Sequence, residues 1–334
     1  MPAAAVKPVP APAVTPAPIS RLGKIQKGRL PMSYRYLFYG ETGIGKSTLA
    51  AHAPNPIWAD IEDGSGRLDV ARYTFRDEAG GHVPHTYAEF MAMIEDLRAS
   101  EHGFQTLVID SLDRLEGLIW KHMVKRDTTS KHPLTTVEDY GYGRGYNNAV
   151  EEWRGLCARL DRLRARGMSI VMLAHSHIKN FKNPTGDDFD RFQMRVNEKS
   201  SPFIREWCDV VGFCSFEQGA KLSDDGRAKG WETGKRFVHF ERTAAYDAKT
   251  RLALPAEIEL DPTDPWAPFA KAVADAVDIG PPELRTAITA ELARIGDDAL
   301  AAPVALAVEK AKDDVEALSR IVNKLKSKEP KAAQ

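Results

Sequence analysis

The segment YGETGIGKST, residues 39–48, decides which fold this sequence is expected to adopt. It follows the apolar run YRYLF and has the spacing GxxxxGK[ST] from Gly40 to Ser47. Glycines in this spacing let the backbone curl around a phosphate, and the following helix presents the positive end of its dipole. The flanking sequence favours a strand before the loop and a helix from Lys46 to about Ala53. The segment therefore predicts a phosphate-binding loop.

Each position of this loop has an expected task. Lys46 is expected to reach the β- and γ-phosphates of a nucleotide, and Ser47 to coordinate Mg²⁺. ATP and Mg²⁺ are accordingly the predicted cofactors. The predicted nucleotide-binding residues are Gly40, Glu41, Thr42, Gly43, Ile44, Gly45, Lys46, Ser47 and Thr48.

Carboxylates end two further apolar segments. TLVID ends in Asp110, which is the predicted second ligand of Mg²⁺, and it is followed by Ser111 instead of the glutamate found in many motor ATPases. The segment WADIEDGSG offers Glu62 as the group that orients the attacking water. An ordinary loop carboxylate explains WADIEDGSG about as well when this segment is taken alone.

Apolar strands alternate with helical patterns along most of the chain. Strands are predicted near 34–40, 55–62, 104–111, 168–177, 209–217, 235–242 and 256–260, and helices over 87–100 and 146–167. Continuous apolar strands separated by helices indicate an α/β fold with a mostly parallel central sheet covered by helices on both faces. The last strands lack intervening helices, which predicts an antiparallel edge.

The composition suggests three regions. Residues 1–30 are rich in Pro and Ala with scattered Lys and Arg, which predicts a disordered basic arm, and residues 31–261 form the predicted ATPase core. Residues 262–334 are Ala-rich and predict a helical appendage with a frayed end. The net charge is −1, and no apolar run is long enough to cross a membrane, so a cytoplasmic protein is expected. Three cysteines without CxxC spacing indicate reduced thiols.

Taken together, these segments resemble the RecA/RadA-like P-loop ATPases, and most closely the phage-encoded RecA-like annealing ATPases of the Sak group. ADIED is similar to the family element that carries the catalytic glutamate, which supports Glu62, and LVIDSL is similar to its Mg²⁺-binding strand. VMLAHSH places His175 where the family has a γ-phosphate sensor. The resemblance covers about residues 33–260 and implies a RecA-like core.

The resemblance also implies two DNA-binding segments. Both combine aromatic and basic side chains, which suit base stacking and phosphate contact with single-stranded DNA. Surface insertions without function are the alternative for each. The candidate residues are Tyr140, Tyr142, Arg144 and Tyr146 in the first segment, and Lys179, Phe181, Lys182, Arg191, Phe192, Arg195 and Lys199 in the second.

A basic pair near the end of the core completes the comparison. Lys249 and Arg251 resemble a pair that reaches into the nucleotide site of the neighbouring subunit in RecA-like filaments, and a basic turn between edge strands is the alternative. The family implies a homo-oligomer, either a filament or a ring, acting on single-stranded DNA beside a single-strand-binding protein.

The predicted function is therefore ATP-dependent binding of single-stranded DNA in recombination or strand annealing, with ATP hydrolysed between subunits. Three alternatives stay open: a regulatory RecA-like ATP switch, a P-loop helicase and a small-molecule kinase. The missing acid after Asp110 argues against a helicase, and the sequence lacks a compact Arg-rich lid of the kinase type.

Overall fold

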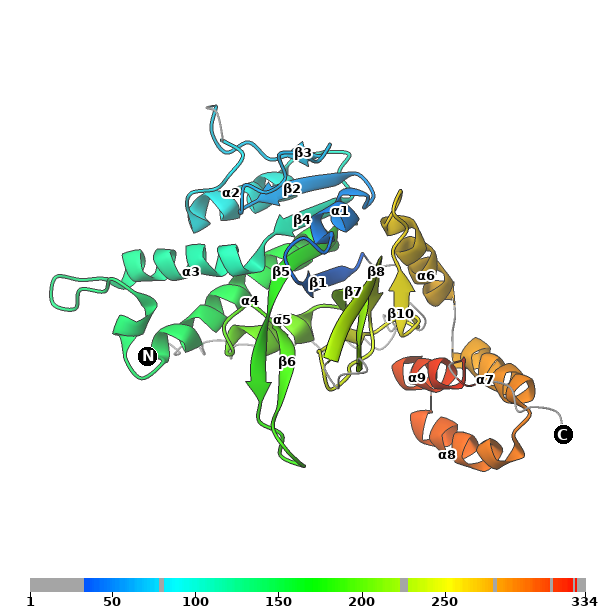
Figure 1. The fold of residues 1–334 in the computed structure, drawn as a ribbon. Coiled ribbons are helices and arrows are strands. Elements are labelled where there is room, and N and C mark those ends of the chain that lie inside the picture. Colours follow the sequence, from blue (N-terminus) through cyan, green and yellow to red (C-terminus); the bar gives the residue numbers. More distant parts are fainter. Residues whose placement is uncertain are drawn as a thin grey trace, which may run out of the picture. The chain divides into compact units, whose positions relative to one another are not determined.

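A computed structural model gives the fold of the chain and describes residues 33–77, 81–222, 228–278, 281–312, 315–326 and 328. The predicted basic arm, residues 1–30, lies outside the described residues. The core is a ten-stranded sheet in the order β10-β8-β7-β1-β5-β4-β2-β3, with β6 paired to β5 and β9 to β7 (Figure 1).

Six strands in the middle of this sheet run parallel, which confirms the predicted fold class. The central ones, β1, β2 and β4, are short and apolar, and parallel strands of this kind are buried on both faces. The six parallel strands are β1 (Arg35–Gly40), β2 (Pro56–Asp60), β3 (Ala71–Arg72), β4 (Thr106–Asp110), β5 (Ser169–Phe181) and β7 (Val210–Leu222).

Antiparallel strands extend the sheet where no helix separates consecutive strands, as the sequence predicts. β8 pairs with both β7 and β10, β9 pairs with β7, and β6 pairs with the distal part of β5 to form a hairpin. Their bounds are β6 (Phe189–Met194), β8 (Ala228–His239), β9 (Lys249–Thr250) and β10 (Glu257–Glu259).

Helices cover both faces of the sheet because side chains alternate along each strand. On β1, Leu37 and Tyr39 pack with the helices on one face, whereas Tyr36 and Phe38 pack with α1 and α6 on the other. The first group consists of α2 (Tyr87–Ala99), α3 (Leu112–Asp127), α4 (Arg144–Arg164) and α5 (Ser200–Trp207), and the second of α1 (Lys46–Ala51) and α6 (Trp266–Asp278).

The core extends further along the chain than the predicted boundary at residue 261. Trp266 and Phe269 of α6 lie against Phe38 of β1, with ring centroids 6.2 Å and 5.3 Å away. A separate apolar cluster belongs to the last helices and buries Leu284, Ile288 and Leu318. These elements are α7 (Pro281–Ile295), the 3₁₀ helix η3 (Asp298–Leu300), α8 (Ala301–Ala311) and α9 (Val315–Lys326). The helical appendage therefore begins at α7.

All three cysteines are free and buried: Cys157 in α4, Cys208 after α5 and Cys214 in β7. Burial raises the pKa of both Cys208 and Cys214 to about 12 and also raises that of Cys157. These thiols are therefore protonated at neutral pH. Within the described residues, no helix combines the length and the apolar character that a membrane crossing requires.

The packing of α6 leads to a first prediction. Phe269→Ala should lower the free energy of unfolding by about 3–5 kcal/mol, because it removes a fully buried ring from the sheet interface. Urea unfolding of the full chain measures this change. Lys271→Ala, on the exposed side of the same helix, is the control and should change stability by about 0.5 kcal/mol or less. An effect of Phe269→Ala as small as that of the control would show that α6 is not part of the core.

Candidate functional site

The loop between β1 and α1 has the geometry that phosphate binding requires. Gly43 and Gly45 have φ angles of +84° and +101°, values that residues with a Cβ atom rarely adopt. A Cβ atom on Gly40 would lie 2.4 Å from the carbonyl oxygen of Cys214, so this position admits no side chain. Ile44 is buried and anchors the loop to the core, while Glu41 and Thr42 are exposed.

The lysine of this loop lies across it. Lys46 Nζ donates hydrogen bonds to the carbonyl oxygens of Gly40 and Glu41, at 3.1 Å and 2.9 Å. Burial lowers its pKa, and nearby acids including Asp110 and Glu62 oppose this shift. On phosphate binding, the ammonium group would replace these neutral carbonyl partners by charged phosphate oxygens, which form stronger hydrogen bonds.

Strand order brings the expected Mg²⁺ ligands together. β5 lies between β1 and β4, and the helix that follows β1 places Ser47 Oγ 2.8 Å from Asp110 Oδ2, to which it donates a hydrogen bond. Burial raises the pKa of Asp110, and the neighbouring carboxylates Glu62 and Asp60 raise it further. A hydroxyl and a carboxylate are oxygen ligands of the kind that Mg²⁺ takes. The charge of a bound ion would offset the repulsion between Asp110 and the neighbouring carboxylates. The residues present therefore fit the ion.

The two acids after β2 have different surroundings. Asp60 is fully buried, and its carboxylate accepts hydrogen bonds from Gly64 N at 3.1 Å and Ser65 N at 3.0 Å. Glu62 is partly exposed and faces solvent on the side of β5, with Oε2 3.9 Å from His175 Nε2. Asp60 fixes the loop, whereas Glu62, with Oε1 3.8 Å from Arg114 Nε, is the acid that faces the cleft.

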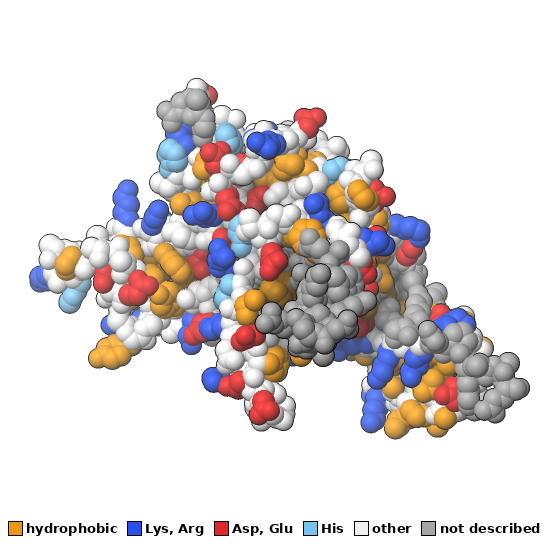
Figure 2. Space-filling view, in the orientation of Figure 1, with side chains coloured by type: hydrophobic (Ala, Val, Ile, Leu, Met, Phe, Trp, Pro, Cys, Tyr) orange, Lys and Arg blue, Asp and Glu red, His pale blue; other side chains and the backbone are white. Residues whose placement is uncertain are grey.

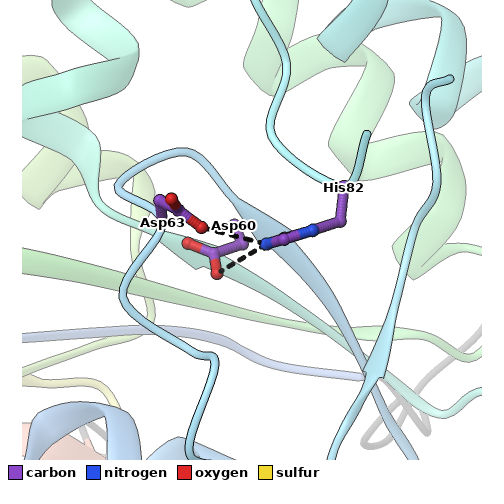
Figure 3. Close-up of side chains that lie close together, drawn as sticks. All are labelled: Asp60, Asp63 and His82. Atoms are coloured by element: carbon purple, nitrogen blue, oxygen red, sulfur yellow. Dashed lines mark hydrogen bonds and ion pairs between the residues drawn. The ribbon is translucent and has the colours of Figure 1, made fainter. Parts of the chain in front are cut away.

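Asp60 also belongs to a cluster with Asp63 and His82 (Figure 3). His82 Nε2 lies 3.1 Å from Asp63 Oδ1 and 3.9 Å from Asp60 Oδ2. Both carboxylate oxygens of Asp60 already accept hydrogen bonds within the loop. We therefore interpret this cluster as a structural contact that fixes the conformation of the loop carrying Glu62.

His175 stands at the end of the buried part of β5, opposite Gly40 in the sheet register. Asp113 of α3 lies 3.1 Å from His175 Nδ1 and accepts a hydrogen bond from its backbone N–H at 3.3 Å. Interaction with His175 lowers the pKa of Asp113 to about 2, although burial acts in the opposite direction. The carboxylate therefore orients the ring so that Nε2 points toward Glu62.

A cleft of about 690 Å³ connects these groups with part of the predicted DNA-binding segments. Thr42, Glu62 and His175 line it together with four of the expected residues, which are Tyr146, Lys179, Arg195 and Lys199. On the same face, acidic, basic and histidine side chains gather over β5 and the start of α3 (Figure 2). Arg195 and Lys199 are exposed, and among the described residues neither side chain forms a hydrogen bond or an ion pair.

The other residues expected to bind DNA lie elsewhere. Tyr142 is fully exposed at the turn before α4, and Arg144 Nε donates to the carbonyl of Tyr140 at 3.0 Å. Phe181 pairs with Phe189 in the β5–β6 hairpin, Lys182 pairs with Asp188 there, and Phe192 packs against Phe213.

Arg191 is a correction to the sequence-based expectation. Its side chain is buried, and Nη2 donates to Asp247 Oδ1 at 2.6 Å and to the carbonyl of Thr243 at 3.1 Å. It joins the hairpin to the segment after β8 and does not face the cleft.

The basic pair requires a second correction. Lys249 Nζ donates to the carbonyls of Arg205, Glu206 and Cys208 and so caps the end of α5. Arg251 bonds Asp209 Oδ1 at 3.0 Å and the carbonyl of Glu206 at 2.8 Å. Both side chains are engaged within their own chain, and we do not carry them into the catalytic set.

The sequence analysis missed several residues that line the cleft. Asp113, Glu116 and Asn197 lie in no recognised pattern, and only the folded chain brings α3 beside the segment after β6. Arg236 was also missed: its guanidinium lies 3.0 Å from the position of a Cβ atom on Gly45. With Gly45 and Thr48 it lines a second cleft of about 390 Å³ beside the phosphate loop.

This loop, its paired Ser47 and Asp110, and the parallel sheet define a P-loop nucleoside triphosphatase. A family model described as an AAA domain matches residues 32–252, which is more than half of the 334 residues. The chain belongs to this family, whose members are P-loop ATPases that use ATP and typically Mg²⁺. Curated proteins provide no match.

The buried Glu116 gives a prediction about pH. Burial raises its pKa from 4.5 to about 7, so the folded chain holds a proton that the unfolded chain releases between these values. Its contribution to stability is full below about pH 4.5 and is lost as the pH rises through about 7. Relative to wild type, Glu116→Gln should therefore gain up to about 3 kcal/mol between pH 5 and pH 8.

Urea unfolding at a series of pH values measures this difference. Glu151→Gln, at an exposed position of α4, serves as the control and should follow the wild-type curve. A Glu116→Gln curve parallel to wild type over this range would contradict the assignment of a raised pKa.

Proposed function

We propose that this P-loop ATPase binds single-stranded DNA and acts in recombination or strand annealing. The observation that supports it best is the shared cleft. Thr42 of the phosphate loop, Glu62 and His175 line it together with Tyr146, Lys179, Arg195 and Lys199. The resemblance to RecA-like annealing ATPases of phages, noted from the sequence, points in the same direction.

The chemistry of the cleft suits an unpaired strand. Cationic side chains attract the phosphate backbone, and an aromatic ring offers a stacking surface that every base can use. Lys179, Arg195 and Lys199 supply the charge, while Tyr146, held edge-on at 5.6 Å from Trp120, supplies the ring. Lys179 is paired with Glu198 at 2.9 Å, so the two cations without ion pairs among the described residues, Arg195 and Lys199, are the leading candidates for phosphate contact.

In the catalytic part of the proposal, Glu62 orients the attacking water and His175 donates a hydrogen bond toward the γ-phosphate. Mg²⁺ supplies charge neutralisation on the phosphate oxygens when bound, and Ser47 with Asp110 would hold it. Asp113 keeps His175 in the orientation that leaves Nε2 free for this role. Lys46, whose Nζ donates to the Gly40 carbonyl, would contact the same phosphates.

The role of Glu62 is tested by Glu62→Gln. Turnover of ATP should fall by about 100-fold or more, because an amide cannot accept the proton of water, while ATP binding stays close to wild type. Steady-state ATPase assays and titration with a fluorescent ATP analogue measure the two quantities. Asp69→Asn, at an exposed position further along the same segment, is the matched control. Unaltered turnover in Glu62→Gln would remove Glu62 from the catalytic set and favour a regulatory ATP switch.

The DNA interface is tested by the double variant Arg195→Ala, Lys199→Ala. If both cations contact phosphates, the salt dependence of single-strand binding should weaken. The negative slope of log K against log salt should decrease in magnitude by roughly 1.4. Fluorescence anisotropy with a labelled oligonucleotide at several salt concentrations gives this slope. Lys271→Ala, on α6, should leave it unchanged. Absence of single-strand binding by the wild-type protein at low salt would overturn the proposed function itself.

Assembly into a filament or ring stays a prediction, as does the partnership with a single-strand-binding protein. With Lys249 and Arg251 held inside their own chain, the support for assembly is the family resemblance alone.

A further inference from the structure

Helix α3 follows Asp110 with Ser111 as its N-cap and carries two carboxyl groups that reach different parts of the site. Asp113 holds His175, as described above. Glu116, about one turn further along, accepts a hydrogen bond from the backbone N–H of Asn197 at 2.8 Å. The same helix therefore contacts both the γ-phosphate side of the site and the segment that follows β6.

That segment carries Arg195 and Lys199, the two cleft cations without an ion pair to any residue that the structure describes. Arg195 N–H donates to the carbonyl of His175 at 2.7 Å, and Val196 is buried. The stretch from Arg195 to Lys199 is thus fixed at its start by His175, which pairs with Gly40 of the phosphate loop, and in its middle by Glu116. α3 therefore contacts this segment directly through Glu116 and Asn197, and indirectly through Asp113 and His175.

The surroundings of Glu116 make it an unusual choice for packing alone. Its side chain is 3% exposed, and among the described residues its Oε1 has no hydrogen-bond partner. Ser200 and Trp153 approach the same carboxylate. A buried carboxyl group with an unpaired oxygen costs free energy that an apolar side chain of similar size would not. A role in connecting two segments accounts for this cost.

We propose that Glu116 is a positioning residue that couples the nucleotide site to the single-strand cleft through its bond to Asn197. This inference rests on the proposed function. Asp110, which would hold Mg²⁺ together with Ser47, lies next to the start of α3, so a shift there on nucleotide binding would reach Asn197 and the flanking Arg195 and Lys199 through Glu116. The coupling element is thus a helix in direct contact with both sites, as a physical account of coupling requires.

Two variants of Glu116 separate coupling from packing. Glu116→Gln keeps an oxygen that accepts from Asn197, whereas Glu116→Ala removes it. The measured quantity is the ratio of ATP turnover with single-stranded DNA to turnover without it. We expect this ratio to fall by about 5-fold or more in Glu116→Ala and to be largely restored in Glu116→Gln. Glu151→Ala on α4 is the matched control and should keep the wild-type ratio.

Hydrogen exchange provides a readout that does not depend on DNA. The peptide containing Asn197 should exchange faster in Glu116→Ala than in wild type or in Glu116→Gln. A non-hydrolysable ATP analogue should change its exchange in wild type and not in Glu116→Ala. Thermal unfolding of each variant identifies any that fails to fold, in which case the comparison rests on Glu116→Gln, which must keep both the ratio and the exchange response.

Three outcomes would overturn the inference. A wild-type ratio in Glu116→Ala, or an equal loss in Glu116→Gln and Glu116→Ala, would show that the bond to Asn197 does not couple the sites. A wild-type protein that neither binds single-stranded DNA nor responds to it would instead reject the proposed function, and this inference with it.

Discussion

The parallel register of four neighbouring strands is the constraint on which the site depends. Gly40 of β1 lies opposite His175 of β5, and Asp110 of β4 lies opposite Asp60 of β2. The carboxyl ends of parallel strands meet at one edge of a sheet, so groups far apart in the chain arrive there without any loop having to reach for them. A shift of one residue in the register of any of these strand pairs would turn the side chains of the shifted strand to the opposite face, and the site residues would no longer lie together.

A second set of contacts orients the side chains at this edge of the sheet. The register places the groups, but their orientation comes from carboxylates on surrounding elements. Asp60 ties down the loop that carries Glu62, and Asp113 fixes the ring of His175. Glu116 extends the same logic to Asn197. Acids that do no chemistry of their own thus decide where the reactive groups point, and α3 supplies two of them.

Local patterns in the sequence were enough to predict the sheet and its phosphate loop, since the spacing of Gly40 to Ser47 and the apolar strands are each contained in a few residues. Local patterns gave wrong predictions where a side chain contacts a residue far away in the sequence. Lys249 looked like a basic residue free to reach outward, because nothing near it in sequence reveals that the end of α5 lies beside it. Arg191 was misassigned for the same reason, since Asp247 is 56 residues away. Asp113 was missed because its partner His175 is 62 residues away.

Because every cysteine is buried, the rate of thiol modification reports how often the folded protein opens. Alkylating reagents attack thiolates, and Cys157, Cys208 and Cys214 are both shielded and held protonated. Modification can therefore proceed only through molecules that have opened, and its rate counts those openings. Cys214 adjoins Gly40 at the phosphate loop, whereas Cys157 lies in α4. Comparing the two rates distinguishes local breathing around the nucleotide from unfolding of the whole core, with no added label.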